Sequence, residues 1–241
     1  FRAIQEPTRS IPGLREYYQA KARSLDLEER TIECEDIFEG ARFQLPYDYL
    51  LIATGAKTNT FGTPGVNERE GRDVHFLKHL FHARRIRNRI IGCFERASRP
   101  SLSQAEKDRL LSFVVVGGGP TSCGCATELR GLLASALAKA YPDLAHRATI
   151  SLIEAGSSIL STFDGALVNF YGKELERKGI LVRTQTAVTA VEPVVDGEVC
   201  NASAARLDNG ELLHFGLMVW SAGLAPVKFV ENLGLPLERS G

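Results

Sequence analysis

The stretch of sequence that decides the fold is FVVVGGGPTS, residues 113–122. Its four β-branched or aromatic apolar residues predict a buried strand, and the glycines predict a tight turn that opens a helix. In a G-x-G-x-x-G pattern, Gly117 permits the turn and Gly119 lets the backbone approach the pyrophosphate of a dinucleotide. The N–H groups at the start of the helix then bind the phosphates. The third position is Ser122 instead of glycine, so the match is imperfect.

A second apolar strand supports this interpretation. It covers residues 148–153 and is followed by Glu154, an acid that can accept hydrogen bonds from both hydroxyls of the adenosine ribose. Glu154 follows Gly119 by 35 residues (154 − 119), against about 20 in the usual pattern. A lengthened helix over 121–140 fits the excess. The glycines alone also fit an ordinary strand-to-helix turn, but this context favours a dinucleotide site.

The composition bounds the class of protein. The 241 residues have a formal net charge of zero, which gives no electrostatic case for binding nucleic acid. No apolar run approaches the roughly 20 residues that span a bilayer. The chain starts at Phe1 and not at Met, so we expect a further N-terminal piece, and no targeting segment is visible.

The cysteines predict neither a redox disulfide nor a metal site, because no two of them have C-x-x-C or zinc-site spacing. We favour buried thiols in a reducing compartment over a redox function. The five are Cys34, Cys93, Cys123, Cys125 and Cys200.

Strands and helices alternate along the chain, which predicts a parallel α/β core. Shorter strands near 187–194 and 203–208 predict an antiparallel excursion from it. The helix over 73–99 carries a cluster of arginines, for which we favour a solvated face over docking to acidic lipids. The other predicted helices cover 121–140 and 163–178, and the predicted strands cover 49–53, 113–116, 148–154, 180–184 and 217–220.

Several stretches, in order along nearly the whole chain, resemble one family, the type II or alternative NADH dehydrogenases. The resemblance is greatest to the mitochondrial enzymes of fungi and plants. The stretches are YDYLLIATGAKTNTFGTPGV (47–66), FLK (76–78), GGGPT (117–121), LIEA (152–155), IL and FD (159–160 and 163–164) and VWSAGLAP (219–226).

The resemblance implies both a fold and a reaction. The fold is α/β, with a Rossmann-like, doubly wound NAD-binding domain inserted in a partial FAD-binding domain, as in disulfide-reductase-like flavoproteins. The reaction is that of a respiratory-chain oxidoreductase, in which hydride passes from NADH to FAD and electrons pass to a membrane quinone without proton pumping. The expected domains are a partial FAD domain at 1–72, an NADH domain with its connecting helix at 73–220, and a return to the FAD domain at 221–241.

By position, the resemblance assigns residues to two cofactors and none to side-chain catalysis. The charge of Glu154 would repel a 2′-phosphate, which favours NADH over NADPH. The residues assigned to NADH are Gly117, Gly118, Gly119, Pro120, Thr121, Glu154, Ala222 and Gly223, and those assigned to FAD are Ala53, Thr54 and Gly55.

The chain departs from the family in its glycine loop. The family continues this loop with Gly-Val-Glu, whereas this chain has Ser122, Cys123 and Gly124. The loss of that acid, expected near the nicotinamide, predicts less efficient hydride transfer. The glycine motif of an FAD domain and the family's later flavin motif are also not found, so we expect a central part of a longer enzyme. By itself it should bind FAD poorly and show little quinone reductase activity.

The resemblance also implies partners and a location. These are a quinone and the surface of the mitochondrial inner membrane, on a side that the sequence does not indicate, with homodimer formation left open. Two alternatives stand beside it. One is another two-domain flavin reductase, such as a ferredoxin reductase or an apoptosis-inducing-factor-like protein. The other is a catalytically impaired NAD-binding relative, for which Ser122 and Gly124 are the support.

Overall fold

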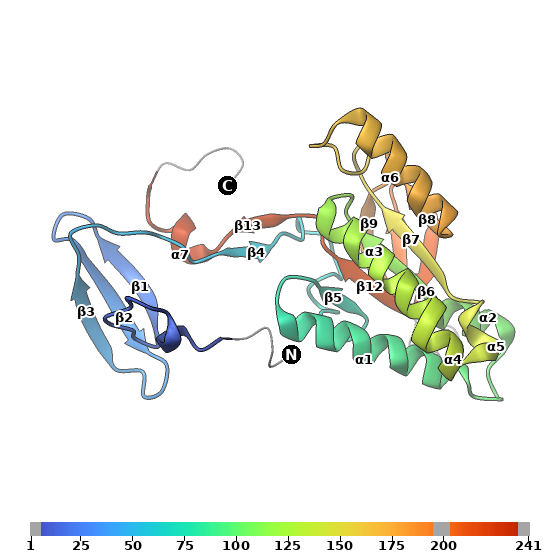
Figure 1. Ribbon diagram of the computed structural model, residues 1–241, viewed down its shortest axis with the longest axis horizontal. Helices are drawn as coiled ribbons and strands as arrows, with labels where there is room; N and C mark the ends of the chain where they lie inside the picture. Colours follow the sequence, from blue (N-terminus) through green and yellow to red (C-terminus); the bar gives the residue numbers. More distant parts are fainter. Residues whose placement is uncertain (1–5, 195–202, 236–241) are drawn as a thin grey trace. The chain divides into compact units, whose positions relative to one another are not determined.

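The computed structural model describes residues 6–194 and 203–235. The chain divides into two compact units, a first unit of residues 1–57 and 224–241 and a second unit of residues 58–223. The first unit holds an antiparallel sheet in the order β1-β2-β3 and a short pair, β4 with β13 (Figure 1). Its elements are a 3₁₀ turn (Thr8–Ser10), β1 (Ala20–Asp26), β2 (Thr31–Asp36), β3 (Arg42–Pro46), β4 (Ala56–Thr58), β13 (Leu224–Pro226) and α7 (Lys228–Glu231).

The second unit is built on a five-stranded parallel sheet in the order β5-β12-β6-β7-β8. The predicted parallel α/β core is therefore confirmed. The strands are β5 (Val74–Phe76), β6 (Ser112–Val116), β7 (Thr149–Ile153), β8 (Ile180–Arg183) and β12 (Leu217–Trp220).

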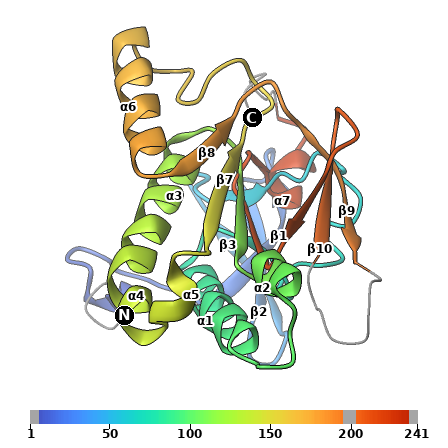
Figure 2. The same cartoon turned by 90° about the vertical axis from the view of Figure 1, so that its right-hand side faces the viewer.

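Helices cover one face of this sheet, and a second sheet covers the other (Figure 2). The second sheet is the predicted antiparallel excursion, in the order β11-β10-β9. Its strands are β9 (Val188–Pro193), β10 (Ser203–Leu207) and β11 (Leu212–Phe215), and the helices are α1 (Leu80–Ala97), α2 (Gln104–Leu110), α3 (Pro120–Leu132), α4 (Ala138–Ala140), α5 (Pro142–Ala145) and α6 (Gly165–Arg177).

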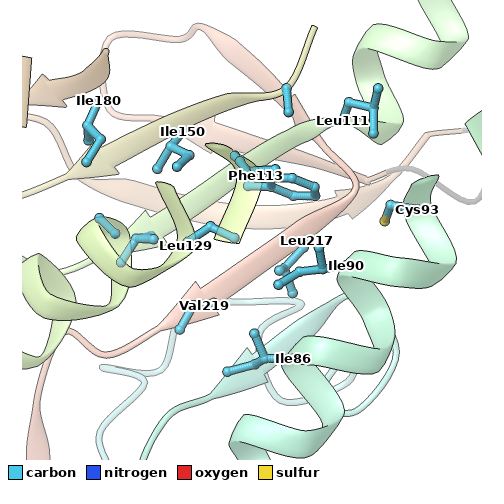
Figure 3. Packing of buried hydrophobic residues seen from close by; sticks show 14 of the residues in the cluster. Ile86, Ile90, Cys93, Leu111, Phe113, Leu129, Ile150, Ile180, Leu217 and Val219 are labelled. Carbon is cyan, nitrogen blue, oxygen red and sulfur yellow. The ribbon is translucent and has the colours of Figure 1, made fainter. Parts of the chain in front are cut away.

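The central strand β6 shows why both faces are covered. Successive side chains of a strand point to opposite faces. Phe113 and Val115 pack under the helices with residues such as Ile90 of α1 and Leu129 of α3 (Figure 3). Val114 and Val116 pack against the antiparallel sheet. Each such fully buried apolar side chain contributes about 1.5–3 kcal/mol to folding, so the strand needs a layer on each side.

The predicted helix over 121–140 is confirmed in its extent. It comprises α3, a π-helical segment (Leu133–Leu137) and α4, and it ends at Tyr141 before Pro142. The helix over 163–178 is observed as α6, which begins after Asp164, whose carboxylate accepts a hydrogen bond from the N–H of Ala166 at 2.8 Å.

The prediction of one helix from residue 73 to 99 is wrong at its start. Residues 74–76 form strand β5, which pairs in parallel with β12. Helix α1 begins only at Leu80, where the Nδ1 atom of His82 accepts a hydrogen bond from the N–H of His79 at 3.0 Å. The apolar spacing near Val74 fits either element, and pairing with a distant strand decides between them.

The prediction of a buried strand at 49–53 is also wrong. Residues 50–55 have no regular structure, and the side chains of Tyr49 and Leu51 are 97% and 88% exposed. A parallel-type strand needs neighbours for its backbone groups and cover for both faces. The described residues provide neither at this segment.

The arginine cluster of α1 is only partly a solvated face. Arg84, Arg85 and Arg87 are exposed, but Arg89 is half-buried and its Nε donates a hydrogen bond to the carbonyl of Gly216 at 2.7 Å. Burial lowers the pKa of Arg89. Among the described residues, no helix has both the length and the apolar content of a membrane span.

Candidate functional site

A cavity of about 320 Å³ opens at the carboxyl ends of the central strands of the second unit. The chain leaves β6 for β7 on one side and returns later to β12 on the other, so β6 and β12 flank the switch point of the sheet. Ligands of open α/β sheets bind at such a point. The cavity is lined by Phe61, Thr63, Val116, Gly117, Ile153, Glu154, Ala155, Thr186, Ala187, Val188, Trp220 and Ala222.

Gly117 is the residue on which the shape of this cavity depends. Its φ is +115°, a conformation that L side chains rarely adopt. A Cβ atom there would lie 2.8 Å from both the Cα of Ala222 and the carbonyl oxygen of Ser221. Its N–H donates to the carbonyl of Ile153 at 2.8 Å. The turn therefore requires glycine at this position, as the sequence predicts.

Gly118 and Gly119 have different roles. Gly118 is buried beneath Glu154, since a Cβ atom there would lie 2.7 Å from that side chain. Gly119 is the exposed N-cap of α3, and a Cβ atom there would meet nothing within 4 Å. Pro120, at the first position of α3, and Thr121 are exposed. The N-terminus of this 13-residue helix is thus open to an anion.

Glu154 follows the last residue of β7, beside the glycine loop. It is half-buried, and its Oε1 accepts a hydrogen bond from the N–H of Gly156 at 2.5 Å. That bond holds the carboxylate over Gly118. The structure thus brings the predicted acid and the predicted glycine loop together on one wall of the cavity.

The opposite wall follows β12. Ala222 lines the cavity, and Gly223 lies against Phe61, whose ring would be 2.9 Å from a Cβ atom at that glycine. The carbonyl of Gly223 accepts a hydrogen bond from the N–H of Asn59 at 3.0 Å. The carbonyl of Asn59 in turn accepts one from Nε1 of Trp220 at 2.9 Å.

The assignment of site residues from the sequence left out part of this wall. It named neither Phe61, Thr63 and Trp220 nor the segment 186–188, all of which line the cavity. Phe61, Thr63 and Trp220 lie within the stretches that carry the resemblance, so the sequence holds a signal for all three. Residues 186–188 carry no motif that could have indicated them.

The predicted FAD residues lie outside this cavity. Ala53, Thr54 and Gly55 are exposed, and no atom lies within 4 Å of a Cβ atom built on Gly55. Their role in binding FAD therefore stays a prediction.

Gly124 of α3 lines a second, apolar cavity of about 590 Å³ between α1 and α3. A Cβ atom on Gly124 would meet nothing within 4 Å, so the missing acid leaves open space and no substitute contact.

The thiols of α3 are not poised for chemistry. Burial raises the pKa of Cys125 to about 11, and burial together with the charge of Glu154 raises that of Cys123 to about 11. Cys34 and Cys93 are buried thiols, and Cys200 lies outside the described residues. Within residues 6–194 and 203–235, no group of acids, histidines and cysteines could hold a metal ion.

Comparison with known proteins agrees with this geometry. The family model for pyridine nucleotide-disulphide oxidoreductases matches residues 6–241. The chain belongs to this family. Membership accounts for a dinucleotide cavity at the switch point of a parallel sheet, and it confirms the predicted fold class.

Relatives within the family confirm the predicted resemblance. The chain is 39% identical to a probable NADH dehydrogenase of Dictyostelium discoideum, over 96% of this chain and 49% of that protein. It is 37% identical to the mitochondrial external alternative NAD(P)H-ubiquinone oxidoreductase B1 of Solanum tuberosum, over 96% of this chain and 40% of that protein. The chain thus spans under half the length of these relatives.

One solved structure has a similar fold. It is NDH2 from Plasmodium falciparum in complex with NADH, which matches with a TM-score of 0.77 at 30% identity, over 90% of this chain and 42% of that one.

Proposed function

We propose that this chain is the NADH-binding part of an alternative NADH:quinone oxidoreductase. The observation that carries the proposal is the cavity at the switch point, where the glycine loop, Glu154 and Ala222 converge. The named relatives, which the chain matches over nearly its whole length, support the reaction.

The cavity and the open start of α3 together support the binding of a dinucleotide. The open space at Gly119 and the N-terminus of α3 would hold the pyrophosphate. Glu154 would accept hydrogen bonds from the adenosine ribose and repel a 2′-phosphate. Ala222 and Gly223, which carry little or no side chain, would leave room for the nicotinamide.

A bound FAD would supply the redox chemistry between NADH and a quinone. Ala53, Thr54 and Gly55 would lie at the flavin, with the domain boundaries at 72/73 and 220/221. The proposal includes a location at the mitochondrial inner membrane, held to its surface, and leaves homodimer formation open. In this assignment the chain's own residues bind and orient NADH.

Calorimetric titration of the 241-residue chain tests the binding half of the proposal. We expect NADH to bind at least ten times more tightly than NADPH, and Glu154→Gln to remove most of that preference, since it removes the charge that repels the 2′-phosphate. Equal binding of the two nucleotides would contradict the role of Glu154. No binding of either would contradict the proposed function.

Flavin absorbance tests the redox half. In the complete enzyme, anaerobic NADH should bleach the flavin, and added quinone, but not ferredoxin, should restore the colour. Reoxidation by ferredoxin alone would favour the other flavin reductases, and no bleaching would favour a non-catalytic relative. The 241-residue chain should retain little FAD, and stoichiometric FAD after purification would contradict that expectation.

A further inference from the structure

Two hydroxyls, of the buried Ser122 and the half-buried Ser221, connect the walls of the dinucleotide cavity. Ser122, in the first turn of α3, has no exposed surface, and Ser221 is the first residue after β12. Their Oγ atoms lie 2.8 Å apart. The hydroxyl of Ser221 also reaches the carbonyl of Val116 at 3.4 Å. Either hydroxyl can donate across the contact between them, and the hydroxyl of Ser122 also reaches the carbonyl of Ser221 at 3.4 Å.

The contact between the two hydroxyls lies next to Gly117 of the glycine loop. A Cβ atom on Gly117 would be 2.8 Å from the Oγ of Ser122 as well as from the backbone of Ser221 and Ala222. The N–H of Ser221 adds a bond to the carbonyl of Val116 at 2.9 Å. Ser122 and Ser221 thus tie the start of α3 to the turn that carries Ala222.

The contact matters because Ser122 occupies a position where glycine is usual. It is the third position of the glycine pattern, where glycine usually serves the close packing of helix against strand. A buried hydroxyl without a partner costs about 1–3 kcal/mol, so a serine there depends on an acceptor opposite. Ser221 supplies that acceptor from 99 residues away.

We propose that the Ser122–Ser221 pair positions the glycine loop for the pyrophosphate of NADH, an inference that rests on the proposed function. The pair fixes the first turn of α3, whose N–H groups face the ligand, relative to Ala222 across the cavity. Ser122 and Ser221 are positioning residues, because neither lines the cavity with its side chain. In this chain a hydroxyl pair takes the place of the third glycine.

The test is a double-mutant cycle on the 241-residue chain, with NADH and ADP-ribose as ligands in calorimetry. Ser122→Ala and Ser221→Ala should each weaken both ligands about fivefold, the loss of one hydrogen bond. The double variant should be weakened by much less than the product of the two single effects, because both substitutions remove the shared contact between the hydroxyls. The matched control is Ser203→Ala, which removes another fully buried hydroxyl, bonded to Asp73 away from the loop, and should leave both affinities unchanged.

Ser122→Gly separates positioning from simple packing. If the serine only obstructs close packing, restoring the glycine should tighten NADH binding. The proposed pair predicts binding about fivefold weaker, as for Ser122→Ala. Tighter or equal binding by Ser122→Gly, or single effects that multiply in the double variant, would overturn the proposal.

Should the Ser122 variants not fold, Ser221→Ala tests the same bond from the other side, and unchanged affinity in it would overturn the proposal. Absence of NADH binding in the unmodified chain would instead reject the proposed function itself.

Discussion

The turns at Gly117 and Gly55 both hold positive φ angles, of 115° and 72°, but their surroundings differ. Gly117 is buried, with backbone of Ser221 and Ala222 where its side chain would be. Gly55 is exposed, and no atom lies within 4 Å of that position. Both follow an apolar run in the sequence, residues 113–116 before Gly117 and 49–53 before Gly55. An apolar run of this kind therefore forms part of a binding cavity only where neighbouring strands enclose it.

The largest expected effect tests the difference between Gly117 and Gly55. Gly117→Ala should lower the free energy of unfolding by about 2–4 kcal/mol, because it combines an unfavourable φ with a clash against backbone. Gly55→Ala should lower it by only about 1 kcal/mol, since the φ alone is unfavourable. Urea unfolding of the two variants measures both costs. Equal losses in the free energy of unfolding would contradict the role of the packing around Gly117.

The second prediction concerns thiols just after the glycine loop. At pH 8, Cys123 and Cys125 of the folded chain should react with iodoacetamide about a hundred times more slowly than in the unfolded chain. Their pKa is raised from 9.0 to about 11, and only the thiolate reacts. Peptide mass spectrometry after labelling in buffer and in urea gives the ratio for each cysteine.

The sign of the accompanying pH effect follows from the raised pKa. Burial favours the neutral thiol, so its contribution to stability is complete below pH 9 and decreases as the pH rises towards 11. Stability that increased over this interval in a chain with both cysteines, relative to a Cys123→Ala, Cys125→Ala variant, would contradict the assignment. A labelling rate near that of the unfolded chain would do the same.

The third prediction concerns Trp220, on the opposite wall of the cavity. Trp220→Phe should lower the free energy of unfolding by about 1–2 kcal/mol, from the lost hydrogen bond to Asn59 and the space left by a smaller ring. Thermal unfolding followed by circular dichroism measures it. Phe76→Leu, which alters a half-buried ring on the neighbouring strand β5 but removes no hydrogen bond, is the matched variant. A smaller loss for Trp220→Phe than for Phe76→Leu would contradict a role for the indole N–H.

The sequence predicts those parts of the site that lie within short segments of the chain. Gly117 and Gly119 belong to one loop between a strand and a helix, and Glu154 ends the next strand, so short segments carry the signal. Phe61, Trp220 and the Ser122–Ser221 pair depend on contacts between residues about 100 or more positions apart. A single sequence does not show such partners.

The errors in the fold have the same origin. The apolar pattern at 49–53 reports a preference for burial but does not show what would cover it, and Tyr49 and Leu51 are exposed. The pattern at 74–76 is short enough to suit either element, and its pairing with β12, more than 140 residues away, makes it a strand.

The smallest expected effect has the opposite sign. Gly124 lies within α3 with an ordinary helical φ, and a Cβ atom there would meet nothing within 4 Å. Gly124→Ala should therefore raise the free energy of unfolding by about 0.5–1 kcal/mol, because alanine loses less backbone entropy in a helix. Gly131→Ala, with equally open space in the same helix, is the matched control and should gain a similar amount in urea unfolding. A loss at Gly124 alone would mean that this glycine is held by a contact at its cavity between α1 and α3. Similar gains at both positions would mean that neither position in the helix needs glycine, in contrast to the turn at Gly117.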